Sequence, residues 1–202
     1  MLKAIIFDVG GVLIRTQSRA GREKWAAKFG MDSWDFENFV FRGESGHQAE
    51  LGQKSFEAHW QWLGRHFGLD ETSLAEMRRD FFSGDTMNTA LVEQIKRLRK
   101  ADYRTGILSN FADDARHRWT VDFPFIAYFD GIIISAEVGM LKPDPKIYHL
   151  AAESVGVQIQ EALFIDDLIG NIEAAKQLGM QTIHFTDPET VQQQLAEITG
   201  VK

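Results

Sequence analysis

Five short apolar runs constrain the fold of this chain more than any other feature. They are Ala4–Phe7, Thr105–Leu108, Gly131–Ile134, Ala162–Ile165 and Gln181–Phe185. Runs this short suit buried strands better than buried helices, and continuous rather than alternating apolar character is typical of strands covered on both faces. The sequence therefore predicts a central sheet with a layer of structure on each side.

Helical patterns separate the last four runs. Apolar residues recur at helical spacing within residues 91–98, 147–151, 172–178 and 191–198. Two of these segments begin with an Asp-Pro pair, Asp144-Pro145 and Asp187-Pro188, in which Asp caps the helix and Pro occupies its first position. Because strands that alternate with helices form parallel sheets, we predict an α/β fold with a doubly wound parallel sheet.

The first run does not follow this rhythm, since roughly 90 residues separate it from the second and one crossover helix needs far fewer. Residues 16–84 contain four candidate helices, with four of the five Trp and eight of the fifteen Phe residues. These side chains supply enough apolar surface for a separate helical core. We therefore expect residues 1–15 and 85–202 to form the main domain, and residues 16–84 to form a four-helix cap inserted after the first strand.

Composition excludes several classes of partner. The 22 basic and 29 acidic residues give a net charge of −7, without the basic stripe that nucleic-acid binding needs. No apolar stretch is long enough to cross a bilayer or to resemble a secretory signal. The absence of Cys excludes disulfides and suits a reducing compartment. We therefore expect a cytoplasmic protein that binds neither nucleic acid nor membrane.

Polar and charged residues follow four of the five predicted strands. Because the carboxyl ends of parallel strands meet at one edge of a sheet, we expect these side chains to converge. Three carboxylates, one ammonium and one hydroxyl in one place would form a cation site beside an anion site. The residues are Asp8, Ser109, Asn110, Lys142, Asp166 and Asp167.

The three carboxylates also predict a metal. Asp8, Asp166 and Asp167 would repel one another if they were clustered without a counterion, and a hard divalent cation such as Mg2+ would relieve that repulsion. Each of the four strand ends carries a residue type that phosphoryl transfer to a carboxylate requires. We therefore expect Mg2+ as the cofactor.

The order of these motifs resembles that of the haloacid dehalogenase-like hydrolase superfamily, whose members are mostly phosphatases. The helical insertion is similar to the cap of the subgroup that includes beta-phosphoglucomutase, the phosphatase domain of soluble epoxide hydrolase and small bacterial sugar-phosphate phosphatases. The resemblance covers essentially the whole chain and implies a Rossmann-like core. The motifs are Asp8-Val9-Gly10-Gly11-Val12, Leu108-Ser109-Asn110, Lys142-Pro143 and Phe164-Ile165-Asp166-Asp167.

The resemblance implies a role for each residue that binds or attacks phosphate. Asp8 would be the nucleophile that forms an aspartyl-phosphate. Ser109 and the backbone amide of Asn110 would bind the phosphoryl oxygens, and Lys142 would neutralise charge on Asp8 and on the phosphate. The implied function is a phosphatase that hydrolyses small phosphorylated metabolites. We expect a monomer or a homodimer.

The resemblance also implies a set of metal ligands. Mg2+ would be bound by the Asp8 carboxylate, the Gly10 carbonyl and Asp167. Asp166 would be either a direct ligand or the holder of a metal-bound water.

The sequence departs from the superfamily pattern at Gly10. Most phosphatases of the superfamily have a second Asp there, which protonates the leaving oxygen and later activates water. Dehalogenases of the superfamily also lack that Asp, but they use no metal and do not usually carry a pair like Asp166-Asp167. Two alternatives remain, a 2-haloacid dehalogenase and a catalytically degenerate binding protein of the same fold.

Roles outside the four motifs stay open. Residues 42–48 are expected to form a cap loop over the site, in which Glu44 or His47 either replaces the missing acid or lies in solvent. Asn171 either orients the site lysine or a ligand water, or caps the helix that follows the fourth strand. Arg15 either binds a substrate anion or lies at the hinge of the cap.

Overall fold

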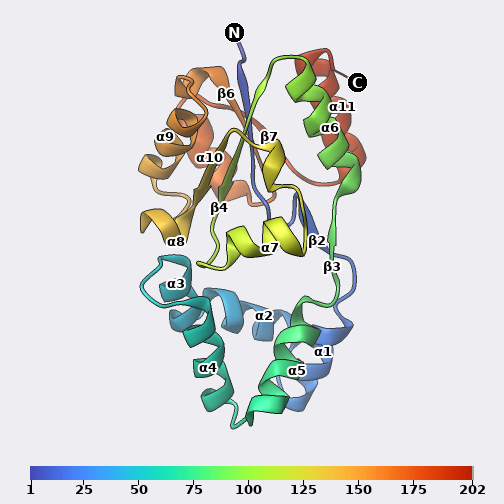
Figure 1. Ribbon diagram of the computed structural model, residues 1–202, viewed down its shortest axis with the longest axis vertical. Coiled ribbons are helices and arrows are strands. Elements are labelled where there is room, and N and C mark those ends of the chain that lie inside the picture. Colours follow the sequence, from blue (N-terminus) through green and yellow to red (C-terminus); the bar gives the residue numbers. More distant parts are fainter. Residues whose placement is uncertain (202) are drawn as a thin grey trace.

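The computed structural model describes residues 1–201 and contains a five-stranded parallel sheet (Figure 1). The strands are ordered β5-β4-β1-β6-β7, so the first strand lies in the middle. This confirms the predicted doubly wound parallel sheet. The strand bounds are β1 Ala4–Phe7, β4 Arg104–Ser109, β5 Gly131–Ile134, β6 Ala162–Asp166 and β7 Gln181–His184.

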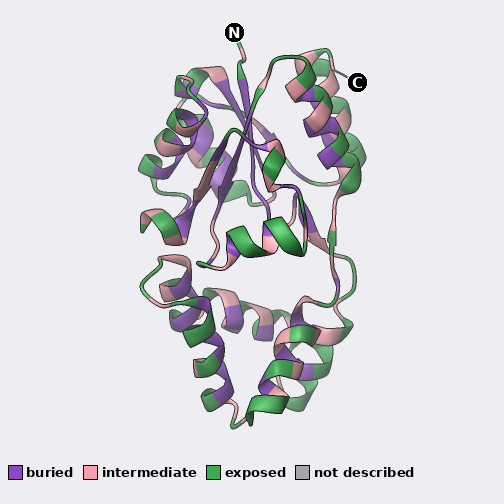
Figure 2. Ribbon diagram, in the orientation of Figure 1, coloured by how far each residue is buried: buried purple, intermediate pink, exposed green. Residues whose placement is uncertain are grey.

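Helices cover both faces of the sheet (Figures 1 and 2). One face packs against α9 (Pro145–Ser154) and α10 (Ile169–Gln177), and the other against α6 (Thr89–Lys100) and α11 (Pro188–Thr199). Alternate residues of β1 enter the two hydrophobic clusters, which explains its uninterrupted apolar run. The shorter elements are α7 Ala115–Val121, α8 Ser135–Val138 and 3-10 turns at Ile126–Tyr128 and Ile159–Glu161.

Five helices lie between the short strands β2 (Ile14–Thr16) and β3 (Asp85–Met87), one more than the sequence predicted. They form a separate body below the carboxyl ends of the sheet strands (Figure 1) and bury a cluster of aromatic side chains that includes Trp25, Phe36 and Trp60. We call this body the insertion. Its helices are α1 Ala20–Lys28, α2 Ser33–Arg42, α3 Glu44–Glu50, α4 Phe56–His66 and α5 Glu71–Phe82.

The additional helix is α3, which replaces the loop expected over residues 42–48. Its buried residues are Ser45, Gly46 and Ala49, so it has no stripe of large apolar residues that a sequence pattern could reveal. A Cβ on Gly46 would lie 2.3 Å from the carbonyl oxygen of Val40 in α2. Close backbone packing against α2 thus holds a short helix with a weak sequence signal.

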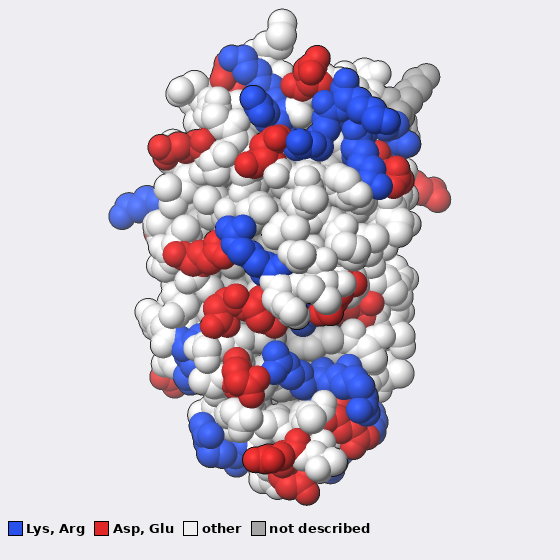
Figure 3. Space-filling model, in the orientation of Figure 1, with Lys and Arg blue, Asp and Glu red and all other residues white. Residues whose placement is uncertain are grey.

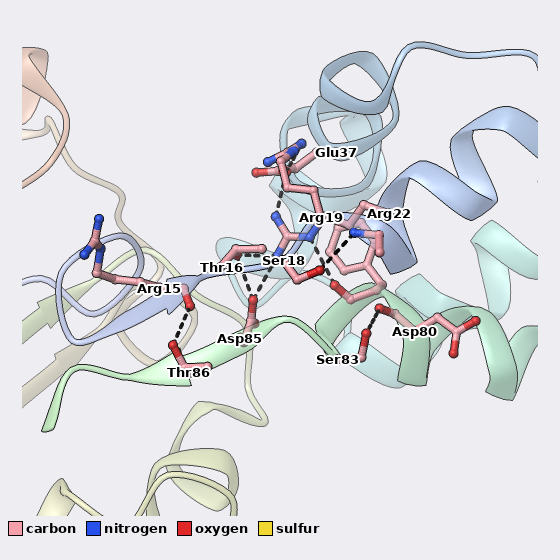
Figure 4. Close-up of polar contacts among 12 residues, drawn as sticks. Arg15, Thr16, Ser18, Arg19, Arg22, Glu37, Asp80, Ser83, Asp85 and Thr86 are labelled. Atoms are coloured by element: carbon pink, nitrogen blue, oxygen red, sulfur yellow. Dashed lines mark hydrogen bonds and ion pairs between the residues drawn. The ribbon is translucent and has the colours of Figure 1, made fainter.

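A buried arginine joins the two connecting strands to the insertion (Figure 4). Strands β2 and β3 pair antiparallel, with Thr16 opposite Asp85. The Arg22 guanidinium in α1 is 2.6 Å from the Glu37 carboxylate and 3.1 Å from the Asp85 carboxylate, and it donates hydrogen bonds to the Thr16 hydroxyl and the Phe81 carbonyl. Arg22 is only 4% exposed, so these ion pairs and hydrogen bonds replace the water that its charged guanidinium loses on burial.

Replacing Arg22 with Met is expected to lower the free energy of unfolding by about 3–5 kcal/mol, because the buried Asp85 carboxylate would lose its closest cation. Urea unfolding of the two proteins measures the difference. Lys24→Met is the matched control on the same helix, since Lys24 is exposed and its pairs with Glu76 and Asp80 lie at the surface. Similar losses in the two variants would show that the Arg22 contacts contribute no more than surface ion pairs.

The surface carries mixed charge. Acidic and basic side chains are interspersed on the face shown in Figure 3, and a group of basic side chains gathers at the end of the molecule opposite the insertion. The last turn of α6 contributes Arg97, Arg99 and Lys100 to that end, where Arg99 pairs with Asp130. Within residues 1–201, no helix combines the length and apolar character that a membrane crossing requires.

Candidate active site

The nucleophile candidate Asp8 lies directly beyond β1, in the middle of the sheet. Its backbone amide donates to the Ile165 carbonyl of β6 at 2.8 Å. The register pairs Phe7 with Ile107 on one side and with Ile165 on the other, so the residues that follow these three strands lie side by side. Asp8 is 7% exposed, which leaves a small part of the side chain open at the carboxyl edge of the sheet.

Lys142 contacts two of the three predicted carboxylates. Its Nζ lies 2.9 Å from Asp8 Oδ1 and 2.6 Å from Asp166 Oδ2. Burial lowers the pKa of Lys142, but the charges of Asp8 and Asp166 outweigh this effect, and the net pKa shift is upward. The side chain is therefore a buried ammonium, held as a fixed point of positive charge between the two carboxylates.

Asp166 is fully buried and saturated with hydrogen bonds. Its carboxylate accepts from Lys142 Nζ, from the Leu168 amide at 2.7 Å, and from the Asn171 side chain, whose Nδ2 is 3.0 Å from both oxygens. These contacts use the acceptor positions that a carboxylate offers. From the sequence, we expect Asn171 either to orient Lys142 or a ligand water, or to cap its helix. In the structure its side chain hydrogen-bonds Asp166, and no side-chain hydrogen bond caps the start of α10.

Ser109 and Asn110 also lie at this edge of the sheet. Ser109 is the last residue of β4 and is buried. The Asn110 side chain forms two hydrogen bonds with the backbone of Lys142, donating to its carbonyl at 3.1 Å and accepting from its amide at 2.8 Å. Asn110 therefore positions the loop that carries the lysine.

The carboxylates form a cluster with excess negative charge. Asp8, Asp166 and Asp167 can each offer one oxygen such that all three oxygens lie within 4.8 Å of one another. Burial raises the pKa of Asp8 to about 7, against the opposing effect of Lys142 and with a further contribution from Asp166 and Asp167. Burial also raises the pKa of Asp167. One ammonium does not balance three carboxylates, so the donor set fits a hard cation such as Mg2+.

The two glycines after Asp8 have different roles in this geometry. Gly11 has a φ of +74°, and a Cβ there would lie 2.3 Å from the Asp167 carboxylate, so only glycine lets the loop approach Asp167 this closely. Gly10 is exposed, and a Cβ there would meet nothing within 4 Å. Position 10 therefore has room for a side chain, and its glycine is not required by the packing.

The insertion brings a residue to this edge that sequence reasoning missed. Glu50 is the last residue of α3, and its backbone carbonyl accepts a hydrogen bond from the Ser135 hydroxyl at 2.7 Å. The candidates chosen from sequence, Glu44 and His47, are exposed on the same helix. No motif surrounds Glu50, and only the docking of α3 on the sheet edge reveals it.

Arg15 lies at the connection between the sheet domain and the insertion. It belongs to β2, and its guanidinium lies over the Phe185 ring, 5.6 Å from the centroid (Figure 4 shows Arg15 on the strand). The structure thus places it on one of the two strands that connect the sheet domain to the insertion.

Similar solved structures share this fold. A Bacteroides thetaiotaomicron enzyme of the same fold, solved as an Asp-to-Ala mutant in complex with magnesium and inorganic phosphate, has a TM-score of 0.75 and 25% identity, covering 92% of this chain and 95% of the other. L-2-haloacid dehalogenase from Xanthobacter autotrophicus has a TM-score of 0.66 at 22% identity, covering 98% of this chain and 83% of the other. The second likeness shows the fold alone.

Two curated relatives illustrate matches over nearly the whole chain. Sesquiterpene phosphatase from Aspergillus oryzae is 27% identical, covering 98% of this chain and 97% of that protein. Bifunctional epoxide hydrolase 2 from Sus scrofa is 29% identical over all of this chain, which spans only 39% of the length of that relative. The family model for haloacid dehalogenase-like hydrolases matches residues 2–179. The chain therefore belongs to the haloacid dehalogenase-like hydrolase family, as its strand-end motifs predicted.

Proposed function

We propose that this chain is a Mg2+-dependent phosphatase that hydrolyses small phosphorylated metabolites through an aspartyl-phosphate on Asp8. The observation that carries the proposal is the contact of Lys142 Nζ with both Asp8 and Asp166, inside a cluster of three carboxylates. A phosphate group that reaches Asp8 would lie beside the ammonium of Lys142 and beside the Mg2+ that the three carboxylates would attract. Residues 1–15 and 85–202 would form the catalytic core, and residues 16–84 the cap.

The comparisons support this choice of chemistry. One relative that matches nearly end to end is a phosphatase, and a solved enzyme of the same fold binds magnesium and inorganic phosphate. The phosphatase activity, the magnesium and the phosphate are properties of those two proteins. For this chain they support a phosphate ester as the substrate class.

The side chains of the core would share the work of phosphoryl transfer. The Asp8 carboxylate would attack phosphorus and break the bond to the leaving oxygen, which divides one difficult displacement into two easier steps. Lys142 would offset charge on Asp8 and on the phosphoryl oxygens, and Asp166, held by Asn171, would keep the ammonium in place. The Ser109 hydroxyl and the Asn110 amide would bind the phosphoryl oxygens.

Asp8, Asp167 and the Gly10 carbonyl would hold Mg2+. Asp166 would support the site through Lys142, because protein donors already use its acceptor positions. When bound, Mg2+ would neutralise negative charge on the carboxylates and on the phosphate.

The alternative activity, 2-haloacid dehalogenation, fits the site less well. Displacing halide requires neither a metal nor a proton donor, so it explains Gly10 but not the buried cluster that includes Asp167. The cluster is the observation that favours phosphate chemistry.

A metal-dependence assay tests the proposed function. In excess EDTA, hydrolysis of 4-nitrophenyl phosphate and of a panel of sugar and polyol phosphates should fall by about 10²-fold or more, and added Mg2+ should restore it. The charge of three carboxylates would otherwise oppose the phosphate dianion. Phosphate release measures the reaction, and chloride release from 2-chloropropionate is assayed in parallel. Full activity in EDTA, or chloride release without phosphate release, would contradict the proposal.

A further inference from the structure

The end of α3 brings Glu50 to the carboxyl edge of the sheet, whereas position 10 in the loop after β1 is a glycine without a carboxyl group. The site needs a proton donor for poor leaving groups, and Gly10 has no side chain to supply it. Glu50 stands at the C-terminal end of α3, where Figure 1 shows α3 directly beneath α8. This is the contact between the insertion and the carboxyl edge of the sheet.

Several contacts fix Glu50 at that edge. The Ser135 hydroxyl, which donates to the Glu50 carbonyl, also accepts from the amide of Phe111, two residues beyond Ser109. At Gly52, which has a φ of +70°, a Cβ would lie 2.1 Å from the Ala136 carbonyl oxygen. The end of α3 and the turn that follows it are therefore held against α8, which follows β5, and α8 is bonded in turn to the loop after β4.

The surroundings of the Glu50 side chain suit a proton carrier. Burial raises the pKa of Glu50 to about 7, against the smaller effects of the charged Arg42 in α2 and Lys142. Lys142 is the same ammonium that contacts Asp8, so one charged group interacts electrostatically with both Glu50 and the nucleophile. A carboxyl group with such a pKa is substantially protonated at neutral pH and can both donate and accept a proton there.

We propose that Glu50 is the general acid and base of this enzyme, supplied by the insertion in place of a carboxylate at position 10. The proposal rests on the phosphatase activity proposed above. In the first step Asp8 forms a bond to phosphorus, the bond from phosphorus to the leaving oxygen breaks, and the Glu50 carboxyl proton moves to that oxygen. In the second step the Glu50 carboxylate takes a proton from water as the water oxygen bonds to phosphorus and the bond to Asp8 breaks. Alcohol and inorganic phosphate are released, and Glu50 ends protonated as it began.

Glu50→Gln tests this role because the amide has nearly the same size as the carboxyl group but neither donates nor accepts a proton near neutral pH. Its kcat/KM for glycerol 2-phosphate should fall about 10²–10⁴-fold, whereas kcat/KM for 4-nitrophenyl phosphate should fall less than about 10-fold, because 4-nitrophenolate leaves without a proton. In the wild-type protein, kcat/KM for glycerol 2-phosphate should decline as pH rises through about 7, where Glu50 loses its proton. Glu50→Gln should lack this decline.

Two further variants sharpen the test. Glu44→Gln removes an exposed carboxylate from the first turn of the same helix and should leave both substrates unaffected. Gly10→Asp adds a carboxylate where the backbone has space for one, and in the Glu50→Gln background it should restore glycerol 2-phosphate hydrolysis at least about 10-fold.

The outcomes separate the two proposals. Equal losses on both substrates in Glu50→Gln, or no loss on glycerol 2-phosphate, would overturn the role of Glu50 while the phosphatase activity stands. A wild-type protein that hydrolyses neither substrate in Mg2+ would overturn the proposed function itself. Circular dichroism and thermal unfolding of each variant show whether it is folded.

Discussion

Asp8→Asn is expected to reduce turnover of every phosphate ester by about 10⁴-fold or more, because the amide forms no covalent bond to phosphorus. Single-turnover reactions with ³²P-labelled substrate should trap labelled protein from the wild type and none from the variant. Trapping a phosphoenzyme also tests the alternative of a degenerate binding protein, which would yield no labelled protein from either.

The loss in Asp8→Asn should not arise from unfolding. Burial raises the pKa of Asp8 to about 7, which means that the folded protein pays to keep this carboxylate ionised. A neutral amide removes that cost, so the melting temperature should not fall. Asp70→Asn is the matched control, because Asp70 is the exposed N-cap of α5 and Asn caps helices equally well. Turnover in Asp8→Asn within 10-fold of the control would exclude Asp8 as the nucleophile.

Lys142→Met should impair both activity and stability. Without the ammonium, the buried carboxylates of Asp8 and Asp166 would face each other unpaired, and the free energy of unfolding should fall by about 3–5 kcal/mol. The kcat/KM for 4-nitrophenyl phosphate should fall by about 10²–10³-fold, since a fixed charge beside the phosphoryl group is lost. Urea unfolding measures the change in the free energy of unfolding, and steady-state kinetics measure the change in kcat/KM.

Two further variants test whether these effects come from the buried ion pair between Lys142 and Asp8. Lys146→Met removes an exposed ammonium from the first turn of α9 and should change neither quantity appreciably. Adding Asp8→Asn to Lys142→Met should recover part of the lost stability, because it removes one of the two unpaired carboxylates. If Asp8→Asn changes the free energy of unfolding equally in the wild-type and Lys142→Met backgrounds, Asp8 and Lys142 are not coupled in the way their 2.9 Å contact implies.

The strands of the sheet could be predicted because their signals are local. The run at Ala4–Phe7 and the run at Gly131–Ile134 coincide with β1 and β5, and the Asp144-Pro145 and Asp187-Pro188 pairs begin α9 and α11 as expected. Continuous apolar runs and capping residues depend on neighbours along the chain, so they can be read without tertiary contacts.

The short helix α3 could not be predicted in this way. It is stabilised by small residues such as Gly46, which allow the backbone of α2 to approach closely. The fit of one backbone against another leaves no periodic pattern in the sequence. The same holds for Arg22, whose partners Glu37 and Asp85 are distant in the chain, and for the contact of Glu50 with Ser135.

For the candidate site, the sequence by itself determined which residue types follow the strands, and the rule that parallel strands end at one edge was enough to bring Asp8, Lys142 and Asp166 together. Only the tertiary structure decided what surrounds them. It showed that Asn171 holds Asp166, that Gly11 allows close approach to Asp167, and that the insertion presents a half-buried carboxyl group. The physical reason is that burial and hydrogen-bond partners set the charge state of a side chain, and both depend on segments that meet only after folding.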